Sequence, residues 1–258
     1  MKKVEFTDGL AINGDSTSRD ALEEAKAWLG DATVPLIVTD PPYGNVVDES
    51  WDKTNMSDAE FAQWMLQWTR LWTEALVPGG AFYVWGGLGT QGFRPFMRYM
   101  VEAETKEFQL ANVITWSKKR AYGVQHNYLY TREELAYFVK GHAKKPHIFN
   151  VPLLEEKRGY AGYNEKYPAK SEFYRRTNVW TDVNELFRGK VHPTQKPQRV
   201  MEIPIEVHTN PGDVVIDIFA GSGATGHAAR KLGRKFILIE KDEAIFDSMI
   251  ERLQRDTT

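Results

Sequence analysis

The 258-residue sequence contains no cysteine. Disulfide bonds, thiolate metal sites and a cysteine nucleophile are therefore excluded. No apolar run approaches the roughly 20 residues that a membrane-spanning helix requires, and residues 1–6 lack the apolar core of a signal peptide. We therefore expect a cytoplasmic protein that does not insert into a membrane.

The chain has no overall excess of positive charge, but its Lys and Arg are concentrated in one region. The chain has 33 Lys and Arg against 35 Asp and Glu, a formal net charge of −2. Residues 116–200 hold 17 Lys and Arg and 8 Asp and Glu, so this region carries +9 and the remainder carries −11. A nucleic-acid-binding protein needs a basic face rather than a basic total. The region, which is also rich in Tyr, is either such a face or an ordinary solvated surface.

An acidic, proline-rich turn follows a predicted buried strand. Residues 34–38 are apolar and largely β-branched, which predicts the strand, and Asp40-Pro41-Pro42-Tyr43 comes directly after it. Ligands bind at the carboxyl ends of strands in open α/β sheets. Asp40 and the Pro41 carbonyl are placed to accept hydrogen bonds from an amine on a planar ring, on which Tyr43 stacks. A turn that only ends the strand is the alternative.

A glycine-rich loop near the end of the chain is the second strong feature. Residues 213–219 and 235–240 are predicted strands, and the segment Asp217-Ile218-Phe219-Ala220-Gly221-Ser222-Gly223-Ala224-Thr225-Gly226 leads from the first of them into a helix. Glycines let the backbone approach a ligand closely. Glu240, at the end of the second strand, is placed to hold ribose hydroxyls. The dinucleotide spacing of three glycines is not well matched.

The motifs and their order resemble the beta group of amino DNA methyltransferases. Asp-Pro-Pro-Tyr resembles motif IV of enzymes that methylate adenine on N6, and Phe-x-Gly-x-Gly resembles motif I, which binds S-adenosyl-L-methionine. Between them lie the basic region and His192-Pro193-Thr194-Gln195-Lys196-Pro197, a hexapeptide that recurs at this place in the family. The resemblance spans nearly the whole chain, in the permuted order of the group.

The resemblance implies an α/β fold with a single domain over residues 1–258. We expect a Rossmann-like methyltransferase sheet of seven strands, mostly parallel, with an antiparallel edge strand. Residues 141–190, which are loop-rich and aromatic, would form a target-recognition insertion. The implied reaction is direct in-line transfer of methyl from S-adenosyl-L-methionine to N6 of a flipped adenine in double-stranded DNA. Positioning and electrostatics then carry the catalysis.

Three groups of site residues follow. The catalytic group is Asp40, Pro41, Pro42 and Tyr43. The cofactor-binding group is Asp15, Thr194, Lys196, Asp217, Phe219, Ala220, Gly221, Ser222, Gly223, Thr225 and Glu240. The basic residues expected to contact DNA are Lys118, Arg120, Lys144, Lys145, Arg158, Arg175 and Arg176. No metal site is expected, because His126, His142 and His147 lack ligand spacing with carboxylates.

Several alternatives stay open. The missing cysteine excludes cytosine C5 methylation, which proceeds through a cysteine adduct in the family that performs it. Adenine N6 is preferred over cytosine N4 because the first motif residue is Asp, where the N4 group more often has Ser. A nucleic-acid-binding module that kept the fold and lost the reaction is a further alternative. The chain would act as a monomer or a homodimer, and a cognate restriction endonuclease is the further partner that stays open.

A capping box predicts the start of a long helix. Ser57 and Glu60 have the required spacing, and apolar residues at helical intervals follow them, from Phe61 to Trp72. We interpret this aromatic stripe, which includes Trp64, as hydrophobic core. Pro78-Gly79-Gly80 is expected to end the helix.

Overall fold

A nine-stranded sheet organises the computed structural model, which describes residues 1–44, 55–87, 89–123, 126, 128–158, 162–164, 167–168, 171–183 and 196–255. Within these residues the strand order is β1-β2-β13-β12-β3-β4-β6-β5-β11. The strands are β1 Lys2–Phe6, β2 Gly9–Asn13, β3 Val34–Thr39, β4 Leu76–Gly86, β5 Phe108–Tyr122, β6 Tyr130–Lys140, β11 Val179–Trp180, β12 Val214–Asp217 and β13 Lys235–Glu240.

The sheet is mostly parallel. Strands β2, β13, β12, β3 and β4 pair in parallel, whereas β6 lies antiparallel between β4 and β5, and β1 is antiparallel at one edge. The predicted Rossmann-like class is therefore confirmed. The strand count differs from the expected seven because the short strands β1 and β11 extend the sheet at its two edges.

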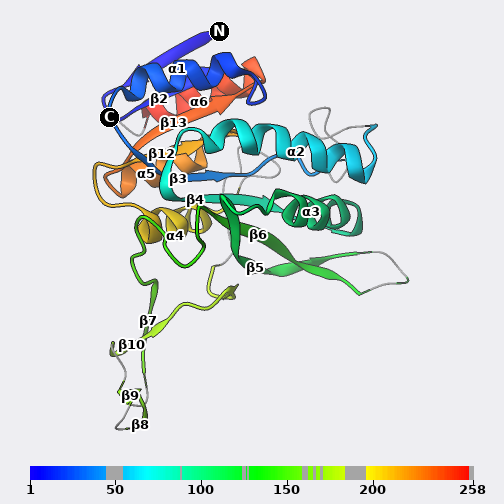
Figure 1. Ribbon diagram of the computed structural model, residues 1–258, viewed down its shortest axis with the longest axis vertical. Coiled ribbons are helices and arrows are strands. Elements are labelled where there is room, and N and C mark those ends of the chain that lie inside the picture. The colour runs from blue at the N-terminus through cyan, green and yellow to red at the C-terminus, as the bar shows by residue number, and fades with distance from the viewer. Residues whose placement is uncertain are drawn as a thin grey trace.

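In the described part of the chain, three helices cover each face of the sheet (Figure 1). On one face lie α1 Arg19–Leu29, α2 Asp58–Thr73 and α3 Gly89–Ala103, and on the other lie α4 Gln198–His208, α5 Ala224–Lys231 and α6 Glu243–Arg255. Strand residues alternate between the two cores, since Phe82 packs with the first group and Tyr83 with the second. No helix in the described part of the chain is long and apolar enough to cross a membrane.

Helix α2 begins as predicted and ends earlier than predicted. Ser57 and Glu60 form a reciprocal capping box, in which the Glu60 carboxylate accepts a 2.8 Å hydrogen bond from the Ser57 amide. The helix stops at Thr73, and Pro78-Gly79-Gly80 already belongs to β4, so the prediction that these three residues end the helix is wrong. The reason is tertiary: β4 begins at Leu76, which pairs with Val34 of β3 before a shift in register.

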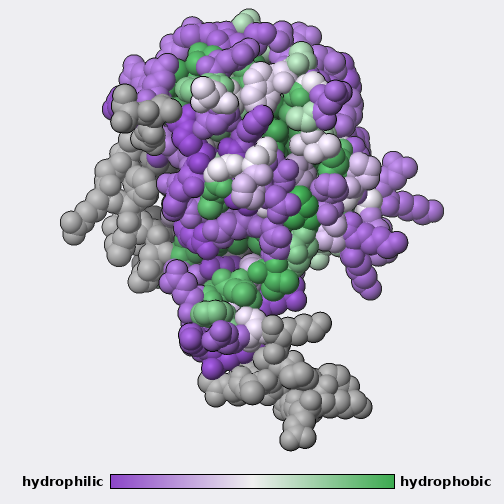
Figure 2. Space-filling view, turned by 90° about the vertical axis from the view of Figure 1, so that its left-hand side faces the viewer, coloured by the Kyte–Doolittle hydropathy of each residue, from purple (hydrophilic) through white to green (hydrophobic). Residues whose placement is uncertain are grey.

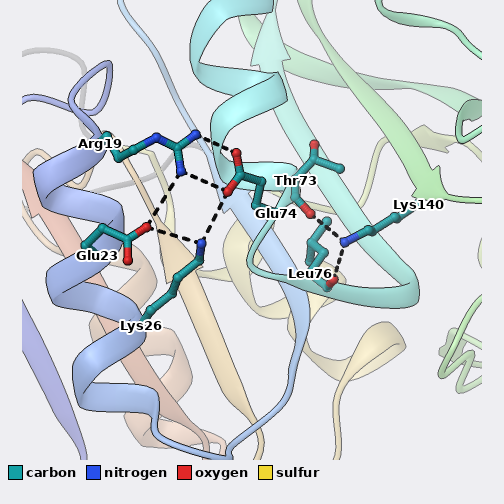
Figure 3. Close-up of polar contacts among 7 residues, drawn as sticks. All are labelled: Arg19, Glu23, Lys26, Thr73, Glu74, Leu76 and Lys140. Carbon is teal, nitrogen blue, oxygen red and sulfur yellow. Dashed lines mark hydrogen bonds and ion pairs between the residues drawn. The ribbon is translucent and has the colours of Figure 1, made fainter.

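A polar network holds the end of α2 against α1 and β6 (Figure 3). Glu74 accepts hydrogen bonds from Arg19 and Lys26, and these bonds lower the pKa of Glu74 to about 2. Arg19 and Lys26 also pair with Glu23. The ammonium of Lys140 donates to the backbone carbonyls of Thr73 at 2.9 Å and Leu76 at 2.7 Å. The network therefore fixes the sheet edge at which β4 starts and β6 ends.

Residues 153–175 include short strands that project from the body (Figure 1). Strand β7 Leu153–Lys157 pairs with β10 Phe173–Arg175, and β8 Gly162–Asn164 pairs with β9 Tyr167–Pro168. Asn150 fixes the base of the projection to α4, because its amide groups donate to the carbonyls of Glu206, Val207 and Thr209. Figure 2 shows a mostly hydrophilic side of the molecule, with an apolar band near the base of this projection.

Candidate active site

A cavity of about 830 Å³ lies at the carboxyl ends of the central parallel strands. Strands β2, β3, β12 and β13 point the same way, so the residues that follow them meet at one edge of the sheet. The cavity is lined by Asp15, Ser16, Thr17, Asp40, Pro42, Trp64, Gln67, Lys196, Met201, Asp217, Ile218, Phe219, Ala220, Gly221, Ser222, Ala224, Glu240, Lys241, Asp242, Glu243 and Ile245.

The glycine loop brings bare backbone to this cavity. Gly221 has a φ of +50°, and a Cβ built on it would meet no atom within 4 Å. Its amide donates a 2.9 Å hydrogen bond to one oxygen of Glu240, and the Asp242 amide donates to the other at 2.8 Å. Burial raises the pKa of Glu240. Each carboxylate oxygen keeps capacity for another donor, such as a ligand hydroxyl.

Two predicted cofactor residues support the loop from behind. Gly223 is the N-cap of α5, and a Cβ on it would lie 2.9 Å from Met249, so this glycine permits close packing on α6. The Thr225 hydroxyl donates a 2.5 Å hydrogen bond to Asp217 and is fully buried. The structure places both residues behind the cavity lining, because the first turn of α5 faces β12. Their roles as direct cofactor contacts are therefore not supported.

Asp217 connects the two motifs. Its carboxylate accepts hydrogen bonds from the hydroxyls of Thr39 and Thr225 and from the backbone amide of Phe219. Burial raises the pKa of Asp217 to about 6, against the lowering effect of these hydrogen bonds. Thr39 directly precedes Asp40, so the same carboxylate holds the strand that leads to the proline turn and the loop at the cavity.

The Asp-Pro-Pro-Tyr turn carries a compact charged cluster. Oδ1 of Asp40 accepts hydrogen bonds from the Tyr43 hydroxyl at 2.7 Å and from Nζ of Lys196 at 3.0 Å, and Oδ2 lies 2.9 Å from the same nitrogen. Nζ of Lys196 also lies 2.8 Å from Oε2 of Glu133 and 5.1 Å from the ring centroid of Trp85. Asp40 and Lys196 line the cavity, so the cluster borders the space beside the glycine loop.

Other predicted residues take distinct places. Pro42 lines the cavity, Pro41 is buried, and the Tyr43 ring is half-buried with its hydroxyl turned onto Asp40. Asp15 forms a turn, accepts hydrogen bonds from Thr17 and pairs with Lys241 at 2.8 Å, while the N-cap of α1 is Ser18. Thr194 lies outside the described residues.

Sequence reasoning missed three residues of this region. Trp64 packs against the core, as its helical spacing predicts, but it also lines the cavity and contacts Phe219, with ring centroids 5.6 Å apart. Gln67 lies one helical turn further on and lines the cavity too. Glu133 joins the charged cluster from β6, and no local motif marks it. Helical periodicity identified the buried side of α2 but could not separate core from cavity wall.

Two of the basic residues expected to contact DNA are buried in the fold. Lys118 is paired with Glu133 and lies 5.2 Å from the Trp116 ring centroid, with a side chain only 9% exposed. The Arg176 side chain is 6% exposed and pairs with Asp182 at 2.5 Å. Neither side chain is exposed at the surface in this fold, because each is ion-paired and covered. Charge counts do not report burial.

The remaining basic candidates are more accessible. Lys144, Lys145 and Arg175 are exposed, and the guanidinium of Arg175 lies over the Phe149 ring. Arg158 is half-buried and donates to the Phe173 carbonyl. The Arg120 side chain lies outside the described part. Among the described residues, no group of three or more His, Asp or Glu could hold a metal ion.

The cavity suits an adenosine-like ligand. Buried and half-buried carboxylates, Glu240 and Asp15, offer acceptors for hydroxyl and amino groups, and Phe219 and Trp64 offer apolar walls for a planar ring. The open backbone at Gly221 allows close approach. The fold and the cavity together define an α/β protein whose ligand site is bordered by a cluster of paired charges.

Comparisons with known proteins identify the family. The model of the N6/N4 DNA methylase family matches residues 34–251, and the chain belongs to this family. The Type II methyltransferase M2.LlaDCHI of Lactococcus lactis subsp. cremoris is 30% identical over an alignment that covers all of this chain and 94% of the relative. The amino DNA methyltransferase family predicted from the motifs is thereby confirmed.

Solved structures agree in fold. The M1.HpyAVI–SAM complex is 26% identical with a TM-score of 0.59, and the match covers 94% of this chain and 98% of that one. The PvuII DNA methyltransferase, described as cytosine-N4-specific, has a TM-score of 0.66 at 19% identity over 96% of this chain and 91% of that one. At this identity the second likeness establishes the fold alone.

Proposed function

We propose that this DNA methylase transfers the methyl group of S-adenosyl-L-methionine to N6 of a flipped adenine in double-stranded DNA. One observation carries the proposal: Asp40 and the glycine loop line a single cavity. The Asp40 carboxylate, proposed to accept hydrogen bonds from the amine of the target base, therefore lies beside the cavity proposed for the nucleoside part of the cofactor. The two halves of a methyl transfer, acceptor and donor, are brought to one place.

The cofactor is S-adenosyl-L-methionine, which is present in the M1.HpyAVI complex. In this chain, Glu240 and Asp15 offer acceptors to its hydroxyl and amino groups, Phe219 and Trp64 flank its base, and Gly221 admits it to the backbone. The bound cofactor supplies an electrophilic methyl group. Gly223 and Thr225 contribute by holding the loop in shape.

Asp40 has the capacity to accept the target amine. Oδ1 already receives two donors, whereas Lys196 is the only partner of Oδ2 among the described residues, so Oδ2 keeps a second acceptor site. A hydrogen bond from the amine to this oxygen, and a second to the Pro41 carbonyl, hold the nitrogen in place and increase its electron density. Catalysis then rests on positioning and electrostatics, because a chain without cysteine forms no thiolate adduct.

Adenine is the proposed target base. The support is Asp40 itself, since the cytosine-N4 group more often has Ser at this motif position. Tyr43 is proposed to stack its ring on the flipped base. Its hydroxyl donates to Asp40, which joins the ring to the carboxylate that accepts the amine.

DNA is proposed to contact the projecting segment. Residues 141–190 would form the target-recognition insertion within a single methyltransferase domain. Exposed Lys144, Lys145 and Arg175 are suited to phosphate contacts. We propose further that the chain acts as a monomer or a homodimer and is paired with a cognate restriction endonuclease.

The test is transfer of labelled methyl from S-adenosyl-L-methionine to mixed-sequence duplex DNA, followed by nucleoside analysis. The expected product is N6-methyladenine. Asp40→Ala should lower turnover by at least about 10³-fold and leave cofactor binding nearly unchanged. Asp31→Ala, at an exposed position before β3, is the matched control with normal turnover.

Three other outcomes would change the proposal. N4-methylcytosine as the product would overturn the base assignment and retain the cofactor and the site. Normal turnover in Asp40→Ala would overturn the catalytic assignment. Cofactor binding without any transfer to DNA would favour the catalytically inactive nucleic-acid-binding module.

A further inference from the structure

Glu133 forms the base of the charged cluster that borders the cavity. It lies on β6, and its side chain is 4% exposed. One oxygen is ion-paired with Lys118, and the other lies 2.8 Å from Nζ of Lys196 and 3.2 Å from the Tyr43 hydroxyl. Glu133 does not line the cavity, so any effect on the reaction passes through its neighbours.

The cluster is balanced in charge. Asp40 and Glu133 supply two carboxylates, and Lys118 and Lys196 supply two ammonium groups, all with side chains at most 21% exposed. Buried charges require partners of this kind. Lys196 is shared, because its ammonium contacts both carboxylates. Glu133 and Asp40 therefore compete for the Lys196 ammonium.

Tyr43 and Lys196 both donate to the Asp40 carboxylate to which the proposed target amine also donates. The Tyr43 hydroxyl and Nζ of Lys196 lie 2.7 Å and 3.0 Å from Oδ1 of Asp40. A buried donor that leaves its acceptor without a replacement costs free energy. Oε2 of Glu133 is already within hydrogen-bond reach of both donors. It can take them over with little movement.

We propose that Glu133 is a positioning residue of the methyl transfer, which receives Tyr43 and Lys196 while Asp40 accepts the target amine. The inference rests on the proposed function, since it assumes that Asp40 binds the amine. Lys118 neutralises the second carboxylate and keeps it available as an acceptor. Sequence position gives no hint of this role, because β6 enters the site only through its place beside β4.

The test compares Glu133→Gln with the double variant Lys118→Met/Glu133→Gln. The single variant leaves one buried positive charge unbalanced, so both stability and kcat should fall. The double variant restores the charge balance, and its unfolding midpoint should return toward that of the wild type. Its kcat should stay about 10²-fold low, because the neutral amide is a poorer acceptor for Lys196 and Tyr43. The KM for S-adenosyl-L-methionine and its calorimetric Kd should change little in both.

Glu134→Gln is the matched control. Glu134 is the neighbouring buried carboxylate on the opposite face of β6, where it accepts a hydrogen bond from Thr115. Its kcat should stay close to that of the wild type.

The outcomes separate the two proposals. A double variant that recovers both stability and kcat would show that Glu133 only balances charge, and would overturn the inference while leaving the proposed function intact. A wild-type chain that binds cofactor and methylates no DNA would overturn the proposed function and, with it, the role of Glu133. Equal loss of kcat in Glu134→Gln would also overturn the inference, because the effect would then not be specific to the cluster.

Discussion

The Thr39 hydroxyl donates a 2.8 Å hydrogen bond to Oδ1 of Asp217, across 178 positions of sequence. Thr39 ends β3, directly before the Asp-Pro-Pro-Tyr turn, and Asp217 ends β12, directly before the glycine loop. The two strands are neighbours in the sheet. This bond therefore fixes the spacing between the acceptor half and the cofactor half of the site.

Thr39→Val should weaken both stability and cofactor binding. Valine keeps the shape of threonine but removes the hydroxyl, so a buried carboxylate oxygen loses a donor, at a cost of about 1–3 kcal/mol. Urea unfolding measures this loss, and calorimetry measures the cofactor affinity. Thr69→Val is the matched control, because its buried hydroxyl bonds Tyr99 away from the cavity. The control should lose stability and keep its affinity for S-adenosyl-L-methionine. Equal cofactor affinity in Thr39→Val and Thr69→Val would show that the Thr39–Asp217 hydrogen bond does not affect cofactor binding.

Asp217→Asn should change how stability depends on pH. The pKa of Asp217 is about 6 in the folded chain, above its ordinary value of 3.8. A raised pKa contributes stability that is fully present below pH 3.8 and is lost as the pH rises through 6. The wild type gains this stability when Asp217 is protonated, and the variant cannot. On acidification from pH 6 to 4 the variant should therefore lose stability relative to the wild type, by up to about 1.4 kcal/mol per pH unit. Urea unfolding at each pH measures the free energy of unfolding of both proteins. If the difference between variant and wild type did not change with pH, this prediction would be contradicted.

His208→Gln should have the opposite effect in the same range. His208 is buried between Tyr83 and the Ile148 carbonyl, and burial lowers its pKa from 6.5 to about 4. A lowered pKa contributes stability that is present above pH 6.5 and is lost as the pH falls through 4. Without the imidazole, the variant should lose less stability than the wild type between pH 6.5 and 4. The slope decides the outcome, because the substitution also changes stability at every pH.

Lys140→Met should lower stability without affecting methyl transfer. The Lys140 ammonium bonds the carbonyls of Thr73 and Leu76, at the sheet edge opposite the cavity (Figure 3). Methionine preserves the apolar stem and leaves both carbonyls without this donor, at a cost of about 1–3 kcal/mol. Lys106→Met, at an exposed position outside the site, should stay within about 0.5 kcal/mol of the wild type. A lower kcat per folded molecule in Lys140→Met would contradict the prediction that the Lys140 contacts act on stability alone.

Local patterns predicted the parts of the fold that depend on local physics. The Ser57–Glu60 capping box, the β3 strand and the strand, loop and helix around Gly221 all formed where their patterns placed them. Each depends on backbone preferences and side-chain spacing within a few residues. The order of the motifs then indicated the family.

Contacts between distant segments could not be predicted in this way. Glu133 reaches Lys196 only because β6 turns back antiparallel beside β4, and no local pattern encodes that pairing. Lys118 and Arg176 counted as surface charge, yet each is buried with an acidic partner. Trp64 follows the same helical period as the core residues of α2 and differs only in what faces it. Burial and partner identity are tertiary properties.

Gly221→Ala should reduce cofactor affinity more than its effect on stability explains. Gly221 has a φ of +50°, and Gly212 has a φ of +90°; a Cβ on either meets no atom within 4 Å. Alanine at either position should therefore cost about 1–2 kcal/mol of backbone strain. Only Gly221 lines the cavity, since Gly212 precedes β12 at the opposite edge of the sheet. The extra methyl at Gly221 occupies space that the ligand needs, so the Kd for S-adenosyl-L-methionine should rise at least about tenfold, or about 1.4 kcal/mol. Gly212→Ala should leave that Kd unchanged at a similar loss of stability. If both variants bind cofactor like the wild type, Gly221 is needed only for the conformation of the turn. The prediction that the ligand approaches the backbone closely at Gly221 would then be wrong.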